Sequence, residues 1–196
     1  MTVETPLRFS PLDGWQNTFD RLPDGLDIRE IPFLTQLSLR VEPGSPAARA
    51  AEDTLGIALP GPSRADMSGE VKALWLGPDE WLLVAPPDRG QDLATRLRAA
   101  IGDAFATVTD VSAQRTTLAV SGHLTREVLA RGCAIDLDPR VTPVGSCLTT
   151  LLAQAGVTLV VRGVAASSVW LLVRSSFAEY VAGWLVDAST EYRGGS

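Results

Sequence analysis

The pattern of apolar and polar residues is most informative between residues 71 and 84, VKALWLGPDEWLLV. Two apolar runs, residues 73–76 and 81–84, flank the sequence Gly-Pro-Asp-Glu, in which proline presets φ for a turn and the aspartate can bond to nearby backbone. This pattern predicts a β-hairpin. Because both faces of both strands are apolar, we expect the hairpin to be covered on both sides, in the middle of a protein.

The remaining elements follow from periodicity and from the placement of glycine and proline. We expect strands over 33–41, 106–111, 115–120, 147–152, 157–162 and 169–174, and helices over 45–56, 88–102, 124–131 and 176–188. The second and the last of these helices open with side chains typical of an N-terminal capping box, Asp88 to Gln91 and Ser176 to Glu179. Residues 1–30 show no sustained period and predict an extended N-terminal arm whose apolar residues need cover from the body of the protein or from a partner. Residues 193–196 predict a disordered tail.

The order strand, helix, hairpin, helix occurs twice along the chain. Glycine, isoleucine and leucine at 44, 57 and 59 recur 78 positions later, and Trp-Leu-Leu-Val at 81–84 recurs 89 positions later, at 170–173. The eleven additional residues fall in the loop around 139–145. The predicted fold class is therefore α+β, with two pseudo-repeated, ferredoxin-like βαββα halves that have antiparallel sheets and cover about residues 31–112 and 113–192.

Charge and composition exclude several classes of function. The net charge is −6, the pI is about 4.8, and the 17 lysines and arginines are scattered, which argues against binding to nucleic acid or to an anionic membrane surface. No apolar stretch approaches the roughly 20 residues of a spanning helix. The first residues, MTVETPLRFSPLDGW, lack the basic and apolar regions of a signal peptide. We expect a cytoplasmic protein.

Residues suited to catalysis or to metal binding are few. His123 is the one histidine, and its position after Gly122 at a helix start favours a role in the first turn over catalysis. Cys133 and Cys147 are too few for a zinc site and are expected to be buried, reduced thiols. Nucleotide-binding glycine motifs are absent from the sequence. We therefore expect no catalytic residue, cofactor site or metal site in this chain.

Two pairs of charged residues could in principle form a functional site. Asp79 and Glu80 are neighbours in a turn, where side chains point apart, and we interpret them as a turn former and a solvated charge. Asp110 and Arg115 lie in TDVSAQRTTL, where the aspartate could contact a pterin-like ring or pair with the arginine. A charge-assisted bond that fixes a strand junction is the simpler interpretation of this pair.

Four tryptophans are large amphipathic side chains: Trp75, Trp81, Trp170 and Trp184. We interpret them first as core residues, second as part of a subunit interface, and third as a flavin-stacking site.

Six segments in this order and spacing resemble the gamma subunit family of heterotetrameric sarcosine oxidase: PFLTQLSLRV, LWLGPDEWLLVAP, TDVSAQRTTLAVSG, ARGCAIDL, PVGSCLTTLLAQA and SFAEYVAGWLVDA. The resemblance runs from about Ser10 to Tyr192. It implies a complex of alpha, beta, gamma and delta subunits that oxidises sarcosine to glycine and forms hydrogen peroxide and 5,10-methylenetetrahydrofolate. It further implies that FAD, FMN, NAD, zinc and tetrahydrofolate are held by the partner subunits, and that the fold is similar to the folate-binding domain of aminomethyltransferases.

Two hypotheses of different kinds follow. The first is a non-catalytic, structural gamma subunit whose apolar arm and tryptophans are buried against partner subunits. The second is a protein that by itself binds tetrahydrofolate or transfers an aminomethyl group, with Asp110 and Arg115 as the folate contacts. The structure has to show whether these two residues come together, and in what surroundings.

Overall fold

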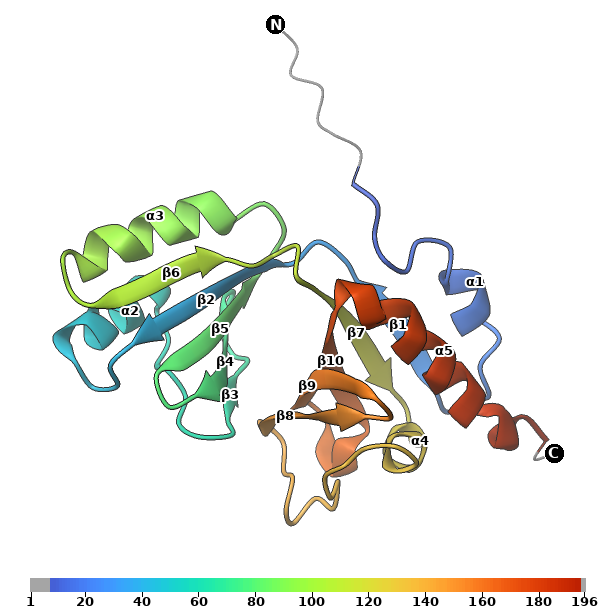
Figure 1. Cartoon of the computed structure of the whole chain (residues 1–196). Coiled ribbons are helices and arrows are strands. Elements are labelled where there is room, and N and C mark those ends of the chain that lie inside the picture. Colours follow the sequence, from blue (N-terminus) through green and yellow to red (C-terminus); the bar gives the residue numbers. More distant parts are fainter. Residues whose placement is uncertain (1–7, 195–196) are drawn as a thin grey trace, which may run out of the picture.

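The computed structural model describes residues 8–194 and has two sheets flanked by helices (Figure 1). The helices are α1 (Gln16–Phe19), α2 (Pro46–Leu55), α3 (Gly90–Ile101), α4 (Thr125–Ala130) and α5 (Ala178–Ala188), with 3-10 turns η1 (Val164–Ala166), η2 (Ser175–Phe177) and η3 (Thr190–Gly194). The strands are β1 (Asp27–Ile31), β2 (Thr35–Val41), β3 (Ala65–Asp66), β4 (Lys72–Gly77), β5 (Glu80–Ala85), β6 (Ala106–Asp110), β7 (Arg115–Ser121), β8 (Cys147–Leu152), β9 (Ala155–Val161) and β10 (Ser168–Arg174).

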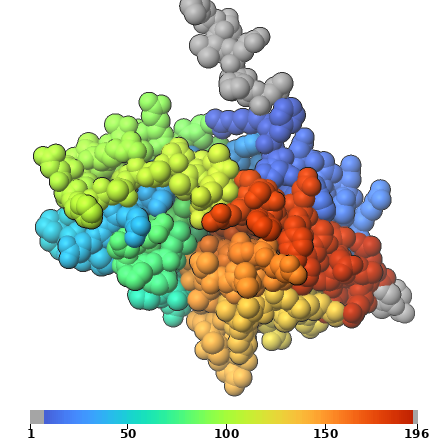
Figure 2. All heavy atoms as spheres, in the orientation of Figure 1, coloured from blue at the N-terminus to red at the C-terminus, as the bar shows by residue number. Residues whose placement is uncertain are grey.

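Each sheet has five strands, in the orders β3-β4-β5-β2-β6 and β1-β7-β10-β9-β8, and every pairing is antiparallel. The predicted α+β class with two antiparallel sheets is thereby confirmed. We call the first sheet with α2 and α3 the first half, and the second sheet with α4 and α5 the second half. Figure 2 shows the halves as adjoining lobes, cyan to yellow-green and yellow to red, with the first described residues above the border between them.

The sheets lie face to face, and each carries its own helices on the opposite face. One apolar cluster joins α2 and α3 to the first sheet, a second joins α4 and α5 to the second sheet, and a third joins the two sheets. The predicted hairpin is β4 and β5, with Trp75 opposite Trp81. Both of its faces are covered as predicted, because Leu83 packs toward the helices and Leu82 packs toward the other sheet.

The repeated Trp-Leu-Leu-Val sequence does not mark equivalent positions in the two sheets, contrary to the offset of 89. Trp81 faces the helices of the first half, whereas Trp170 faces the other sheet. A shift by one residue in a strand exchanges its two faces. Since both faces of β5 and β10 are buried and apolar, the sequence pattern fits either register, and only the packing distinguishes them.

The segment predicted as a separate arm belongs to the second half where the structure describes it. Strand β1 forms the edge of the second sheet beside β7, with Ile28 opposite Val120. Leu12 and Phe19 are each 4% exposed and lie in the core cluster of the second half. The predicted boundary at residue 30 therefore cuts through β1. Residues 1–7 of the predicted arm lie outside the described residues.

Helix ends agree with the sequence in one case and differ in two. The Ser45 hydroxyl caps α2 by accepting a bond from Ala48 N at 3.1 Å, and Gly56 ends this helix at φ 69°. Asp88 does not cap α3: it has φ 64° and forms an ion pair with Arg8 instead. The expected capping box at 176–179 is replaced by η2, which leads directly into α5. Of the predicted tail, residues 193 and 194 belong to η3, and residues 195–196 lie outside the described residues.

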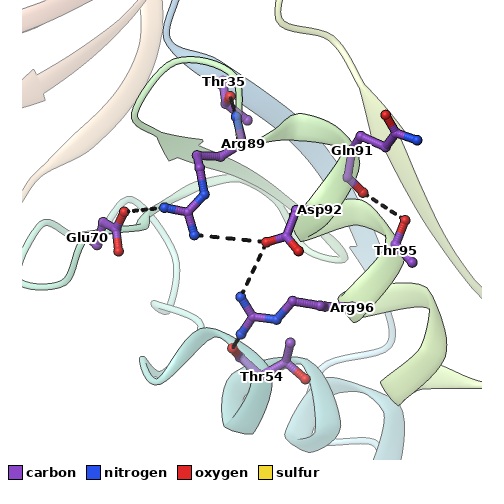
Figure 3. A network of polar contacts seen from close by, with 8 residues as sticks. All are labelled: Thr35, Thr54, Glu70, Arg89, Gln91, Asp92, Thr95 and Arg96. Atoms are coloured by element: carbon purple, nitrogen blue, oxygen red, sulfur yellow. Dashed lines mark hydrogen bonds and ion pairs between the residues drawn. The ribbon is translucent and has the colours of Figure 1, made fainter.

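A polar network joins the two helices of the first half (Figure 3). Arg89, just before α3, donates its backbone N–H to Thr35 Oγ1 at 3.0 Å and pairs with Glu70 at 2.7 Å. Arg96 lies 3.7 Å from Asp92 and donates to the carbonyl oxygen of Thr54, at the end of α2, at 3.1 Å. These charged side chains are well exposed, so the network orients the two helices and adds little net stability.

Candidate functional site

Asp110 ends strand β6, at the connection between the two halves. Its Oδ1 accepts hydrogen bonds from the backbone N–H of Ser112 at 2.9 Å and from the Ser112 hydroxyl at 2.6 Å, an arrangement that closes a turn. Its Oδ2 lies against Gly90 at the start of α3, where an added Cβ would come within 2.5 Å of this oxygen. Glycine at position 90 is therefore what allows the carboxylate to approach the helix.

The charge-assisted bond predicted between Asp110 and Arg115 is not formed among residues 8–194. Side chains alternate between the faces of a strand, and Asp110 shares its face with Val108, toward the helices. Arg115 shares its face with Ala119, toward the other sheet. The turn between the two residues supplies Ser112 as the nearer hydrogen-bond partner of the aspartate.

Arg115 begins β7 and lies directly opposite Arg174 of β10. Burial lowers the pKa of the half-buried Arg115 guanidinium, the charge of Arg174 lowers it further, and Glu80 acts in the opposite direction. Like charges opposite each other in a ladder are unfavourable. Two arginines therefore lie side by side at this end of the space between the sheets, in a chain that is acidic as a whole.

Asp110 and Arg115 nevertheless line one pocket of about 570 Å³ at the connection between the halves. Its wall combines arginines, hydroxyls and two phenylalanines; the lining residues are Arg8, Phe9, Ser10, Pro11, Phe33, Asp110, Ser112, Ala113, Arg115, Thr116 and Ser175. The volume is in the range of small-molecule sites and equals the space of a few side chains. The sequence-predicted pair thus shares a pocket without sharing a bond.

Phe33 is a pocket residue that sequence reasoning missed. It lies in the crossing from β1 to β2, has φ 60°, and leaves 40% of its surface exposed. A left-handed conformation costs a residue with a Cβ about 1–2 kcal/mol, and strain of this kind gathers at functional positions. Phe9, 75% exposed, lines the same pocket. No sequence signal predicts a positive φ at a phenylalanine, so only the three-dimensional structure reveals this conformation of Phe33.

The other acidic candidates have structural partners. Asp79 forms a two-oxygen contact with Arg40, both distances being 3.1 Å, and Glu80 Oε1 accepts a bond from the Ser38 hydroxyl at 3.1 Å. Their carboxylates therefore point to different residues, as expected for neighbours in a turn. His123 is exposed, and its ring lies so close to Gly25 that a Cβ there would come within 2.0 Å of it.

The two thiols are unpaired. Burial raises the pKa of the Cys147 thiol to about 12, and this thiol contacts the carbonyl oxygen of Trp75 at 3.4 Å between the sheets. Burial also raises the pKa of Cys133, which is half-buried. Within residues 8–194 there is no group of three His, Cys, Asp or Glu residues that could hold a metal ion.

Four of the five tryptophans, those interpreted from the sequence, pack in the core clusters, in agreement with the first interpretation of them. Trp81 is buried toward α2 and α3, and its Nε1 donates to the carbonyl oxygen of Pro60 at 2.8 Å. Trp170 is 8% exposed between the sheets, with the Arg162 guanidinium 4.6 Å above its ring, and its Nε1 has no hydrogen-bond partner among the described residues. Trp75 and Trp184 are half-buried at the edges of these clusters.

Comparison with known proteins identifies relatives over most of the chain. The model of the sarcosine oxidase gamma subunit family matches residues 40–191. The sarcosine oxidase subunit gamma of Corynebacterium sp. (strain P-1) is 40% identical over 170 residues, which are 85% of this chain and 81% of the relative. The chain belongs to the sarcosine oxidase gamma subunit family. The Arthrobacter sp. subunit gamma is 39% identical over 168 residues, or 84% and 80% of the two chains.

Solved structures agree with membership of the gamma subunit family. A chain of the heterotetrameric sarcosine oxidase from Corynebacterium sp. U-96, in complex with pyrrole 2-carboxylate, has a TM-score of 0.89 and 35% identity, covering 97% of this chain and 99% of that one. Aminomethyltransferase T of the glycine cleavage system from Bartonella henselae matches with a TM-score of 0.63 and 16% identity over 92% of this chain and 50% of its own, which shows a shared fold. No helix within residues 8–194 is long and apolar enough to cross a membrane.

Proposed function

We propose that this chain is the gamma subunit of a heterotetrameric sarcosine oxidase, with a structural and non-catalytic role. The observation that carries the proposal is the match to a chain of the Corynebacterium sp. U-96 complex, which extends over 97% and 99% of the two chains at a TM-score of 0.89. The complex oxidises sarcosine to glycine and forms hydrogen peroxide and 5,10-methylenetetrahydrofolate. The chain supplies a scaffold for the subunits that carry out this chemistry.

The positions of the polar side chains support a non-catalytic role. Asp79 and Glu80 are bonded to Arg40 and to Ser38. The high pKa of Cys147, about 12, leaves almost no thiolate at neutral pH, and a thiolate is what nucleophilic catalysis needs. Each of these groups has a structural task that accounts for its position.

The partners and cofactors in this proposal lie outside the chain. The alpha, beta and delta subunits complete the heterotetramer in the cytoplasm, and FAD, FMN, NAD, zinc and tetrahydrofolate are held by them. No residue of this chain is assigned to any of these groups. Omitting this chain is therefore expected to impair assembly of the complex more strongly than it changes the absorption spectrum of the flavins in the partner subunits.

The proposal includes a duplicated origin for the two halves, each a ferredoxin-like unit. Its support is the matching strand order: β6-β2-β5-β4-β3 in the first sheet corresponds to β1-β7-β10-β9-β8 in the second. In each, the helix pair follows equivalent strands, α2 after β2 and α4 after β7, then α3 after β5 and α5 after β10. This is the βαββα pattern with one further strand at each edge of the sheet.

Co-expression tests the assignment. The tagged full chain is produced together with the alpha, beta and delta subunits, and the purified material is examined by native mass spectrometry and by oxidation of sarcosine. The expected result is one complex that contains one copy of each chain and forms hydrogen peroxide from sarcosine. An active complex of the other three subunits that excludes this chain would contradict the proposal.

A second candidate function is binding of tetrahydrofolate by the chain alone, because Asp110 and Arg115 line one pocket. Calorimetric titration of the isolated full chain with tetrahydrofolate tests it. Saturable binding that Asp110→Asn abolishes, with an unchanged melting temperature, would favour this candidate. Absence of heat at millimolar tetrahydrofolate would eliminate it.

A further inference from the structure

The pocket where the two halves meet has the composition of a protein interface. We call its open part, together with the adjoining Arg174, the junction surface: the pocket contributes Phe9, Phe33, Arg115 and Ser175, and Arg174 lies opposite Arg115 in the β7–β10 ladder. We propose that the junction surface binds an extended acidic segment of a partner subunit, with a carboxylate held by the arginines and an apolar side chain held between the phenylalanines. This inference rests on the proposed function and names the part of the chain through which it is exercised.

The arginines indicate the charge of the missing partner. Arg115 and Arg174 stand opposite each other in the β7–β10 ladder, and neither belongs to an ion pair within residues 8–194. The acidic groups nearby do not pair with these arginines. Asp110 accepts bonds from Ser112, Glu30 accepts bonds from the hydroxyls of Ser10 and Thr116, and Glu80 accepts a bond from Ser38 and acts on Arg115 only through its charge. A carboxylate from outside would offset both the repulsion and the partial burial of Arg115.

Arg8 also lines the pocket. It pairs with Asp88 at 2.7 Å, and the two side chains are 53% and 70% exposed. Arg8 is therefore neutralised within the chain, whereas Arg115 and Arg174 are not. The unneutralised charge thus lies at the β7–β10 end of the junction surface, which is where a carboxylate is expected to bind.

The phenylalanines indicate that the partner also brings apolar surface. Phe9 and Phe33 are 75% and 40% exposed, so both leave apolar surface open in the part of the chain that the structure describes. Phe33 keeps this position although its backbone is strained, with φ 60°. Phenylalanine and arginine are both enriched in protein interfaces, and arginine is frequent among hot spots.

The dimensions favour a segment over a flat contact. The pocket holds about 570 Å³, enough for two or three side chains of an extended chain but too little for a helix. The Ser175 hydroxyl in its wall donates to the carbonyl oxygen of Ala113 at 3.0 Å and keeps its lone pairs to accept a bond from a backbone N–H of such a segment. An acidic residue next to a branched or aromatic residue is the simplest sequence that fits.

Phe33→Gly separates binding from stability. Glycine adopts φ 60° freely, and the relief of this strain offsets the partial burial that is lost with the ring, so this variant should melt close to the temperature of the wild type. Ala153→Gly is the matched control, because Ala153 has φ 50° in the turn between β8 and β9. It relieves the same kind of strain and leaves the junction surface unchanged.

The measurement is a competition inside the complex. Wild-type and variant chains with different tags are co-expressed with the alpha, beta and delta subunits, and the share of each in the purified complex is measured by mass spectrometry. Phe33→Gly is expected to be disfavoured about tenfold or more, as for loss of a hot spot. Ala153→Gly is expected to take an equal share.

Charge reversal tests the arginines in the same format. Arg174→Glu, at an exposed position, should be disfavoured about tenfold or more, and Arg126→Glu on the exposed surface of α4 is the control with the same change of charge. Raising the salt concentration should narrow the difference between wild type and Arg174→Glu. The melting temperatures of both isolated chains show whether folding is affected.

The outcomes separate the two proposals. A wild-type chain that never enters the complex would contradict the proposed function and with it this inference. A wild-type chain that assembles, with Phe33→Gly and Arg174→Glu taking equal shares, would overturn the junction surface alone. Saturable binding of succinate or tetrahydrofolate to the isolated chain, lost in Arg115→Gln, would make the pocket a small-molecule site and would also overturn it.

Discussion

The two halves reach the same strand order with different parts of the chain. In the first half, the edge position beside β2 is taken by β6, which follows α3 after a short loop. In the second half, the corresponding position beside β7 is taken by β1, which precedes the entire first half. The first half is thus continuous in sequence, whereas the second is completed by the N-terminal segment (Figure 1).

The second half depends on the N-terminal segment for part of its core. The N-terminal segment buries Leu12, Phe19 and Ile28 in the core of the second half before the chain crosses to the first. Substitutions near the beginning of the chain should therefore lower the stability of the second half.

Deleting residues 1–31 should abolish cooperative folding of the second half. Four buried side chains, Leu12, Phe19, Leu26 and Ile28, leave the core, and each contributes about 1.5–3 kcal/mol, against a total stability of about 5–15 kcal/mol for a typical domain. Hydrogen exchange read by mass spectrometry should show loss of protection in β7 to β10 and residual protection in β2 to β5.

Ile28→Ala provides the graded version of this experiment. It is expected to cost about 2–5 kcal/mol, measured by urea unfolding. Val108→Ala in β6 is the counterpart in the first half, since Val108 is buried beneath α3. If the deletion left the urea midpoint and the protection of β7 unchanged, β1 would not be part of the second half's core.

The two thiols should differ strongly in reactivity toward iodoacetamide. A pKa of about 12 leaves Cys147 with roughly 1,000-fold less thiolate at pH 8 than a thiol of pKa 9, and its place between the sheets excludes the reagent. Half-buried Cys133 should be alkylated first, as peptide mass spectrometry would show. Urea that separates the halves should expose Cys147, so equal labelling rates in buffer would contradict the packing of the sheets.

Replacing Trp81 and Trp170 by phenylalanine compares a buried indole N–H that has a hydrogen-bond partner with one that has none among the described residues. Trp81→Phe leaves the carbonyl of Pro60 without its donor, whereas Trp170→Phe removes a buried N–H that has no partner among the described residues. The first should therefore cost about 1–2 kcal/mol more than the second, measured by urea unfolding. Equal losses would mean that the Trp81 hydrogen bond contributes nothing net.

The smallest effect concerns the contact between Arg131, after α4, and Glu191 in η3. The hydrogen bond and charge of Arg131 lower the pKa of Glu191. The folded-state pKa is thus below the unfolded one, so the contribution to stability is present above the unfolded pKa and is lost as pH falls through the folded value. Glu191→Gln should slightly lower the melting temperature at pH 7 and leave it unchanged at pH 2. A difference that persisted at pH 2 would assign the effect to packing.

The sequence identified more of the fold than of the site. Ser45 marks the start of the helix over 45–56 and Gly56 marks its end, and the hairpin contains its own turn residues. Local sequence was therefore enough to predict these elements. Asp110 and Arg115 were correctly brought to one place but not to one bond. Their partners depend on which face of the strand each occupies and on Ser112 and Gly90, which no local pattern connects.

The sequence alone was enough to find most strands and helices after residue 33, to show that the central hairpin is buried on both faces, and to assign the family; it did not reveal α1 and β1 in the N-terminal segment. Only the tertiary structure decided that Trp81 and Trp170 face opposite ways, that β1 completes the distant half, and that Phe33 is held strained beside the pocket. The physical reason is that periodicity reports whether a residue is buried, whereas the identity of its neighbours depends on contacts between segments far apart in the chain.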